Sequence, residues 1–279
     1  MGATNEEMIK AWNEELAEAW VRRREQLDAP AAPLGHEAMD ALALEPGMTV
    51  LDVGCGTGGT TRELADRVSP GGSVTGVDVS RPMLKAAREL AAGRQDVRFV
   101  EGDAQTADLG RGVYDGVFSR FGVMFFDDPV AAFGNIREAT KPDGRLAFVC
   151  WRDALLNPCM SAPVMAAIPI CGPPEMPADP HAPGPFSFAD RDRVRDVLRS
   201  AGWSDVEVEP LDIEFRFQTS AEELLDLMME IGPLGSMTAE ADDETKARVR
   251  EAALEVLRSF ETSGTVATPS ATWLVTARR

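Results

Sequence analysis

The chain has 279 residues, of which 44% are hydrophobic, so it is long enough to bury a substantial core. It carries 28 basic against 46 acidic residues, a net charge of -18. This charge argues against nucleic acid and against an anionic membrane as partners, because both are bound by basic surfaces that release counterions. The four cysteines form no C-x-x-C pair and only two histidines are present, so no metal site is expected.

The beginning of the chain predicts neither a leader peptide nor a membrane anchor. "MGATNEEMIKAWNEELAEAW" lacks a basic region followed by an apolar stretch, and no apolar run is long enough to span a bilayer. We therefore expect a cytoplasmic protein with reduced thiols. The oligomeric state stays open, with a homo-oligomer as one alternative.

Two helices are predicted before the first strand, as an N-terminal helical cap over 1–45. The first begins at a capping-box pattern formed by Thr4 and Glu7, and we expect it to end at Asp28-Ala29-Pro30. Its apolar residues recur every four positions: Met8, Trp12, Leu16 and Trp20. A second helix is expected over about 36–44.

Strands and helices then alternate over 46–151, which is expected to be the cofactor-binding core. The predicted strands cover 49–53, 73–78, 97–101, 113–118 and 145–151, and the predicted helices cover 60–68, 81–91 and 129–140. This alternation indicates a parallel sheet with helices on both faces.

The remaining chain is expected to add a lid and to complete a single domain over 1–279. Residues 152–188 are rich in proline and predict a lid that contains a short amphipathic helix. The C-terminal part, 189–279, predicts a helix over 190–201 ending at Gly202, then one long alternating strand, "VEVEPLDIEFRF". Two helices are expected within the insertion 221–262, and "TWLVTAR" is expected to be the last strand.

The stretch "VLDVGCGTGG", residues 50–59, is the first motif with chemical content. Gly54, Gly56 and Gly59 match the dinucleotide pattern G-x-G-x-x-G, which is weak evidence by itself. Asp52 is more informative, because an ionised carboxylate at the end of a buried strand is costly unless it is paired. It favours a cationic or hydrogen-bond-donating ligand over a pyrophosphate.

Two further acids follow the next two predicted strands. Asp78 ends "VTGVDV", where a carboxylate can accept hydrogen bonds from both hydroxyls of a ribose. Asp103, in "FVEGDAQT", could accept from an exocyclic amine. The alternative is that Asp52 caps a helix and that Asp78 and Asp103 only form turns. Their repeated spacing favours a nucleoside that carries a positive charge.

At these motifs the sequence resembles the class I S-adenosylmethionine-dependent methyltransferases, and most closely the branch that resembles ubiquinone and menaquinone biosynthesis enzymes. "VLDVGCGTGG", "GVDVS" and "EGDAQ" match its first three motifs, and "YDGVFSRFGVMFF" and "KPDGRLAFVCW" match its fourth and fifth strands. The resemblance implies an α/β, Rossmann-like sheet of seven strands, mostly parallel with one antiparallel strand, and helices on both faces. We assign the strand within 206–217 to that antiparallel position.

The resemblance also implies a cofactor, S-adenosyl-L-methionine, with S-adenosyl-L-homocysteine as product. The glycine loop would approach its aminoacyl end, Asp78 its ribose and Asp103 its adenine. The implied cofactor-binding residues are Asp52, Gly54, Cys55, Gly56, Thr57, Gly58, Thr61, Asp78, Val79, Ser80, Met83, Gly102, Asp103, Ala104, Ser119, Arg120 and Phe121.

Aromatic residues predict a pocket for a small acceptor. They follow the fourth and fifth strands and line one face of the first helix, and their alternative role is ordinary packing. The candidate pocket residues are Trp12, Trp20, Phe121, Phe125, Trp151 and Arg152. His181, in the lid, is a weak candidate for a general base, because most histidines in such loops are simply solvated.

Three functions are considered. The first, which the resemblance implies, is methyl transfer to a small, apolar or aromatic acceptor at carbon, nitrogen or oxygen, in the tailoring of natural products. The second is an NAD(P)-dependent oxidoreductase, which the glycine pattern permits but Asp52 and the single tyrosine, Tyr114, argue against. The third is a subunit that binds S-adenosylmethionine without catalysing a reaction.

Overall fold

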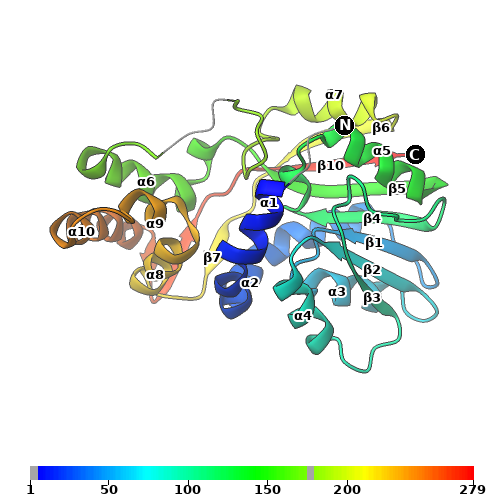
Figure 1. Cartoon of the computed structure of the whole chain (residues 1–279), viewed down its shortest axis with the longest axis horizontal. Coiled ribbons are helices and arrows are strands. Elements are labelled where there is room, and N and C mark those ends of the chain that lie inside the picture. The colour runs from blue at the N-terminus through cyan, green and yellow to red at the C-terminus, as the bar shows by residue number, and fades with distance from the viewer. Residues whose placement is uncertain (1–5, 175–178) are drawn as a thin grey trace.

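The computed structural model describes residues 6–174 and 179–279, and it contains one large sheet in the order β3-β2-β1-β4-β5-β10-β6 (Figure 1). Its strands are β1 Thr49–Val53, β2 Ser73–Asp78, β3 Val97–Glu101, β4 Tyr114–Arg120, β5 Thr140–Trp151, β6 Ser204–Leu211 and β10 Thr272–Arg278. The sheet confirms the predicted Rossmann-like class. The sequence order reverses between β1 and β4, where open α/β sheets bind ligands at the carboxyl ends of their strands.

The helices between these strands agree with the sequence within a few residues. They are α3 Gly59–Arg67, α4 Arg81–Leu90, α5 Pro129–Ala139 and α7 Arg191–Ser200. Ser80 and Asp128 accept hydrogen bonds from the backbone N–H groups of Met83 and Ala131, which fixes where α4 and α5 begin. Gly202, just after α7, has a φ of 89°, which suits glycine at a helix end.

The antiparallel strand is β10, and not the strand that the sequence suggested. β10 pairs antiparallel with both β5 and β6, so β6 runs in the same direction as β1 to β5. The alternating pattern of 206–217 indicated an edge strand, and β6 does lie at the edge of the sheet. Alternation reports that one face of a strand is exposed, and it does not report direction.

The N-terminal segment differs most from expectation. It forms α1 Glu6–Lys10, a π-helix Ala11–Glu15 and a long helix α2 Ala17–Ala41, which continues through Pro30 and Pro33. Each internal proline removes a backbone hydrogen bond and costs about 3 kcal/mol. Leu34 and Ala38 are completely buried immediately after them, so packing offsets that cost. Thr4, half of the predicted capping box, lies outside the described residues.

A helical lobe stands beside the sheet (Figure 1). It contains α6 Pro158–Cys171, α8 Ala221–Ile231, α9 Pro233–Thr238 and α10 Asp243–Ser259, together with a small sheet of β7 Phe215–Phe217, β9 Thr265–Thr268 and β8 Glu261–Thr262. The single strand predicted over 206–217 is therefore wrong, because β6 ends at Leu211 and β7 joins the lobe. The insertion also holds three helices where two were expected.

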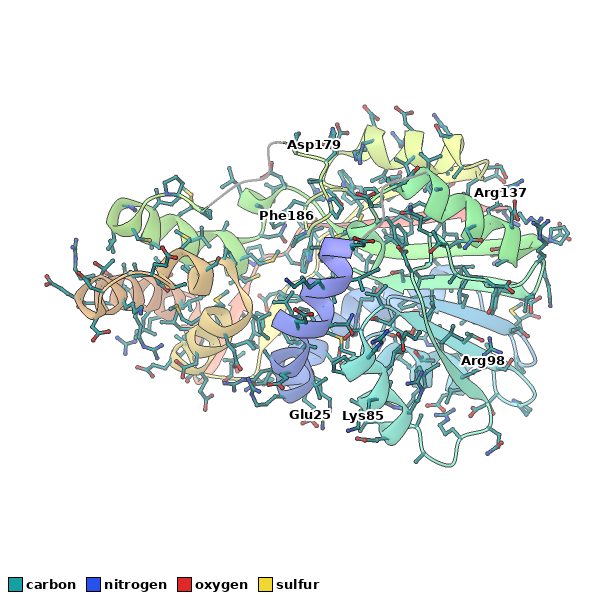
Figure 2. All side chains as sticks on the ribbon, viewed as in Figure 1. Glu25, Lys85, Arg98, Arg137, Asp179 and Phe186 are labelled. Carbon is teal, nitrogen blue, oxygen red and sulfur yellow. The ribbon has the colours of Figure 1, made fainter. Side chains whose placement is uncertain are left out.

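The helix α2 lies between the sheet and the lobe, and it contacts β4, β5, β7 and α8. Its outer face is polar. Figure 2 shows Glu25 of α2 and Lys85 of α4 at the lower rim of the molecule, and both are exposed. Within the described ranges, no helix combines the length with the apolar content that crossing a membrane requires.

Candidate functional site

The glycine loop connects β1 to α3 at the carboxyl end of the sheet. Gly54, Gly56 and Gly58 have φ values of 71°, 52° and 74°, a region that favours glycine. Gly54 also lacks room for a side chain, because a Cβ there would stand 2.6 Å from the Cα of Gly122. The loop after β1 is thus packed directly on the loop after β4.

Asp52 lies under this loop and is only 1% exposed. Its Oδ2 accepts hydrogen bonds from the hydroxyls of Thr60 and Thr61, at 2.7 and 2.6 Å, whereas its Oδ1 has no partner among the described residues. Burial raises the pKa of Asp52 to about 6, against the opposing effects of the two hydroxyls and of Arg120. Asp52 accepts its hydrogen bonds from hydroxyls and not from backbone N–H groups, so it does not act as a helix cap. Its Oδ1 atom is free to accept a hydrogen bond from a ligand.

Asp78 fastens the loop to the end of β2. Its Oδ2 accepts from the backbone N–H of Gly56 and its Oδ1 from that of Ser80, both at 2.8 Å. Burial raises the pKa of this carboxyl group as well. An ionised carboxylate has about four acceptor positions, so Asp78 can hold the loop and still accept from two hydroxyls of a ligand.

Asp103 and its neighbours follow β3. Asp103 accepts a hydrogen bond from the backbone N–H of Gln105 at 2.9 Å, which is the turn-forming role that the sequence left open. Ala104 is buried, and its carbonyl accepts from the side chain of Asn135 at 2.8 Å. The third acid is therefore in a rigid turn, with Gly102 directly before it.

Cys55 and Ser119 belong to the frame beneath the loop. A Cβ on Gly76 of β2 would stand 2.8 Å from the Sγ of Cys55, so this side chain points into the sheet. Burial raises the pKa of the Cys55 thiol well above its usual range. The Ser119 hydroxyl donates to the carbonyl of Val53 at 2.7 Å and accepts from Gly122. Of these two predicted ligands, Cys55 can contribute only its backbone.

The N-terminal segment is hydrogen-bonded to the loop after β2. The Ser80 hydroxyl donates to the carbonyl of Trp12 at 2.7 Å. Asn13 donates from Nδ2 to the carbonyl of Val79 and accepts at Oδ1 from the N–H of Arg81, both at 2.9 Å. These bonds place the π-helix over the predicted cofactor edge. Asn13 was missed from sequence, because a single polar residue on a helix carries no signal for a contact 68 residues away.

Aromatic rings continue from this edge toward the lobe. Trp12 meets Trp20 and Phe125 edge to face, with ring centroids 5.3 Å apart in each pair. Phe121 stacks on Trp151 at 4.3 Å, with an angle of 6° between the ring planes. Phe121 has a φ of 64°, which is unusual for a residue with a side chain and sets the direction of its ring. The indole Nε1 of Trp20 is buried and has no partner among the described residues.

Arg120, at the end of β4, forms an ion pair with Asp28 of α2. The Arg120 side chain is 15% exposed, and its aliphatic part runs beside Gly35, where a Cβ would stand 3.1 Å from the Cδ of Arg120. The sequence predicts for Asp28 only a position at the end of the first helix. The structure instead places it beside the glycine loop, which no local sequence pattern could indicate.

Two predicted site residues, Arg152 and His181, do not lie with the glycine loop and the aromatic rings. Arg152 forms an ion pair with Asp212 at 2.8 Å and covers the ring of Trp273, which also lies beside Arg191 of α7. His181 lies in a shallow groove with Val130, Asp190 and Arg193, next to the start of α7. The structure does not bring the His181 imidazole together with the aromatic rings.

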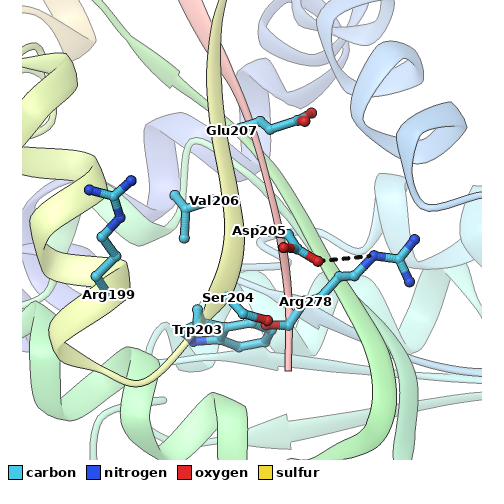
Figure 3. A pocket seen from close by; sticks show the side chains of 7 residues that line it. All are labelled: Arg199, Trp203, Ser204, Asp205, Val206, Glu207 and Arg278. Atoms are coloured by element: carbon cyan, nitrogen blue, oxygen red, sulfur yellow. Dashed lines mark hydrogen bonds and ion pairs between the residues drawn. The ribbon is translucent and has the colours of Figure 1, made fainter.

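A second surface groove, of about 480 Å³, lies at the end of the sheet opposite to the glycine loop (Figure 3). Arg278, one of its lining residues, pairs with Arg145 in the first half of β5, and so marks the amino ends of the parallel strands. The lining is formed by Arg199, Trp203, Ser204, Asp205, Val206, Glu207 and Arg278. Ligands of such sheets bind at the other end, so this groove is not part of the site.

Comparison with known proteins gives a consistent result. Residues 50–144 match the model of a methyltransferase domain. Nocamycin O-methyltransferase from Saccharothrix syringae is 32% identical over 208 residues, which cover 69% of this chain and 72% of that protein. Demethylmenaquinone methyltransferase from Staphylococcus aureus is 35% identical over 106 residues, 38% of this chain and 44% of that protein.

Solved structures share the fold. The YcgJ protein of Bacillus subtilis has a TM-score of 0.57 at 15% identity and covers 88% of this chain and 98% of its own. Phosphoethanolamine N-methyltransferase 2 of Haemonchus contortus, in complex with phosphomonomethylethanolamine and S-adenosylhomocysteine, has a TM-score of 0.50 at 18% identity, covering 86% and 52%. At these identities the likeness extends to the architecture only.

Proposed function

Because the chain belongs to the class I S-adenosylmethionine-dependent methyltransferases, we propose that it methylates a small apolar or aromatic acceptor in the space walled by Trp12, Phe121 and Trp151. The observation that carries the proposal is the meeting of two surfaces at one edge of the sheet. One is a row of strand-end acids, and the other is made of two groups of aromatic rings, one around Trp12 and one around Trp151.

The residues at the acid edge fit the cofactor of this family. A buried carboxylate oxygen without a partner, Oδ1 of Asp52, suits the ammonium of an aminoacyl group. Asp78 retains acceptor positions for ribose hydroxyls, and the backbone around Val79 and Met83 would flank the adenine. The remaining contacts are proposed for Gly54, Gly56, Thr57, Gly58, Thr61, Ser80, Gly102, Asp103, Ala104, Ser119, Arg120, Phe121 and the backbone of Cys55.

When bound, the cofactor would supply a methyl group on a sulfonium for transfer to the acceptor atom, with S-adenosyl-L-homocysteine as the leaving group. The protein's part is mainly alignment, which can contribute about 7 to 11 kcal/mol in favourable systems. The rigid stack of Phe121 on Trp151 would fix the acceptor in line. The N-terminal segment, hydrogen-bonded through Trp12 and Asn13, would exclude water.

The acceptor class follows from the walls of the site and from the curated relative. Stacked and edge-on rings favour a flat or prenyl-like molecule, and their faces can stabilise positive charge that develops on it. The relative from Saccharothrix syringae is named for O-methylation of nocamycin. We therefore propose an acceptor among natural products that undergo tailoring.

Transfer of a labelled methyl group tests this function. The full chain is incubated with methyl-labelled S-adenosylmethionine and a panel of phenols, indoles and prenylated acceptors. Label is expected in an organic product, and Trp151→Ala is expected to abolish transfer while cofactor binding persists. His181→Ala is the matched control and should transfer label at the wild-type rate. Cofactor binding without transfer to any member of the panel would favour the non-catalytic subunit.

A further inference from the structure

The ion pair of Arg120 with Asp28 joins two elements that are 92 residues apart in the chain. Arg120 ends β4, next to β1, and its charge is close enough to Asp52 to lower the pKa of that carboxyl group. Asp28 belongs to α2 and is 40% exposed. A single guanidinium thus lies between a buried acid of the site and an acid that can reach water.

The Asp28 carboxylate lies close to two positively charged groups, the Arg120 guanidinium and the start of helix α3. Its Oδ2 is 3.1 Å from the position of a Cβ on Gly59, the first residue of α3. No side chain caps this helix, because the residue before it is Gly58. Free N–H groups at a helix start carry partial positive charge. Burial lowers the pKa of the Arg62 guanidinium in α3, and the negative charge of Asp28 opposes that shift.

Arg120 and the start of α3 therefore form an anion site that is filled by the carboxylate of Asp28. The site is next to the glycine loop and next to Asp52. An aminoacyl group presents an ammonium and a carboxylate on one carbon, so a site for it needs an acid and a cation side by side. Asp52 and Arg120 meet that requirement.

We propose that Arg120 binds the carboxylate of the cofactor's aminoacyl end, and that Asp28 occupies this subsite until the cofactor displaces it. The inference rests on the proposed function and adds the residue that selects cofactors with a complete aminoacyl group. Displacement moves only one side chain. The helix α2 stays in place through its buried Leu34 and Ala38 and through the ion pair of Arg23 with Glu230 at 2.9 Å.

Calorimetric titration with two ligands isolates this subsite. S-adenosyl-L-homocysteine carries the aminoacyl group, and 5'-methylthioadenosine keeps the ribose and adenine but lacks the carboxylate and the ammonium. Arg120→Met should weaken S-adenosylhomocysteine binding about tenfold or more, since it removes a charged hydrogen bond. Binding of methylthioadenosine should stay at the wild-type value.

Asp28→Asn should act in the opposite direction, because it removes the competing charge. We expect it to strengthen S-adenosylhomocysteine binding several-fold and to leave methylthioadenosine unchanged. Asp226→Asn is the matched control. It breaks the exposed ion pair with Arg250, between α8 and α10, and should change neither affinity.

Three results would overturn the inference. The first is an equal loss of affinity for both ligands in Arg120→Met, and the second is an unchanged affinity for S-adenosylhomocysteine in that variant. The third is an Asp28→Asn variant that binds S-adenosylhomocysteine no better than the wild type. If Arg120→Met fails to fold by circular dichroism, Arg120→Lys should still show a selective loss for S-adenosylhomocysteine. A wild-type chain that binds neither ligand would instead contradict the proposed function.

Discussion

Asp52 is almost completely buried, yet one of its carboxylate oxygens has no partner in the described chain. Such an atom costs stability in the free protein, and it is tolerated where a ligand can satisfy it. The sequence identified this residue because an acid at the end of a buried strand is costly unless it is paired or hydrogen-bonded. It could not identify Thr60 and Thr61 as the donors, because their orientation depends on how α3 packs on β1.

Asp52 gives a testable dependence of stability on pH. Its pKa is about 6 in the folded chain against 3.8 without burial, so the folded state binds the extra proton between these values. The free energy of unfolding should therefore fall as pH rises from about 4 through 6. Asp52→Asn should remove this contribution, although that of Asp78 would remain. Urea unfolding at pH 4.5 to 7.5 measures the difference, and parallel curves for the two proteins would contradict the assignment.

Gly122 is a residue whose importance comes from contact between two loops. A Cβ there would stand 2.6 Å from the carbonyl oxygen of Val53 and 2.8 Å from the Cα of Gly54, and neither backbone can yield cheaply. Gly122→Ala should lower the free energy of unfolding by about 1 to 3 kcal/mol. Gly134→Ala, in α5 with open space around it, should instead raise it by about 0.5 to 1 kcal/mol. Thermal unfolding of both variants checks this contrast, and similar shifts would refute it.

At the scale of elements, the central strands and helices were predictable because each has a regular pattern and a clear end. The N-terminal helix was not, because local rules end a helix at Pro30. Contacts with β4 and β5, far along the chain, keep α2 intact through two prolines. The break of the strand predicted over 206–217 was equally hidden, since "PLDIEF" alternates without interruption while the backbone passes from one sheet to another.

The attachment of the N-terminal segment to the loop after β2 makes a prediction at this scale. Asn13→Ala removes two hydrogen bonds, to Val79 and from Arg81, each worth about 0.5 to 1.5 kcal/mol. Amide hydrogens of residues 8–20 should then exchange about tenfold faster or more, while those of β1 keep their protection. Lys10→Ala, which removes only an exposed contact with Glu14 at 3.9 Å, is the control. Unchanged exchange in Asn13→Ala would show that the segment is held by other contacts.

At the scale of the whole molecule, the sequence predicted three acids at one edge of the sheet but not how the rest of the chain surrounds them. The acids at the ends of β1, β2 and β3 follow from the register of a parallel sheet, which the alternation of strands and helices already indicates. The aromatic space depends on how α2 and the lobe meet the sheet. Trp151, for example, meets Phe121 on one side and Phe215 of the lobe on the other, and these residues are far apart in the chain.

The central claim is that this edge binds S-adenosylmethionine, and calorimetric titration tests it most directly. The full-length chain should bind S-adenosyl-L-homocysteine at one site and give no heat with NADPH. Asp78→Ala should weaken that binding about tenfold or more, whereas Asp127→Ala, at an exposed position, should not change it. Saturable binding of NADPH together with no response to S-adenosylhomocysteine would contradict the account.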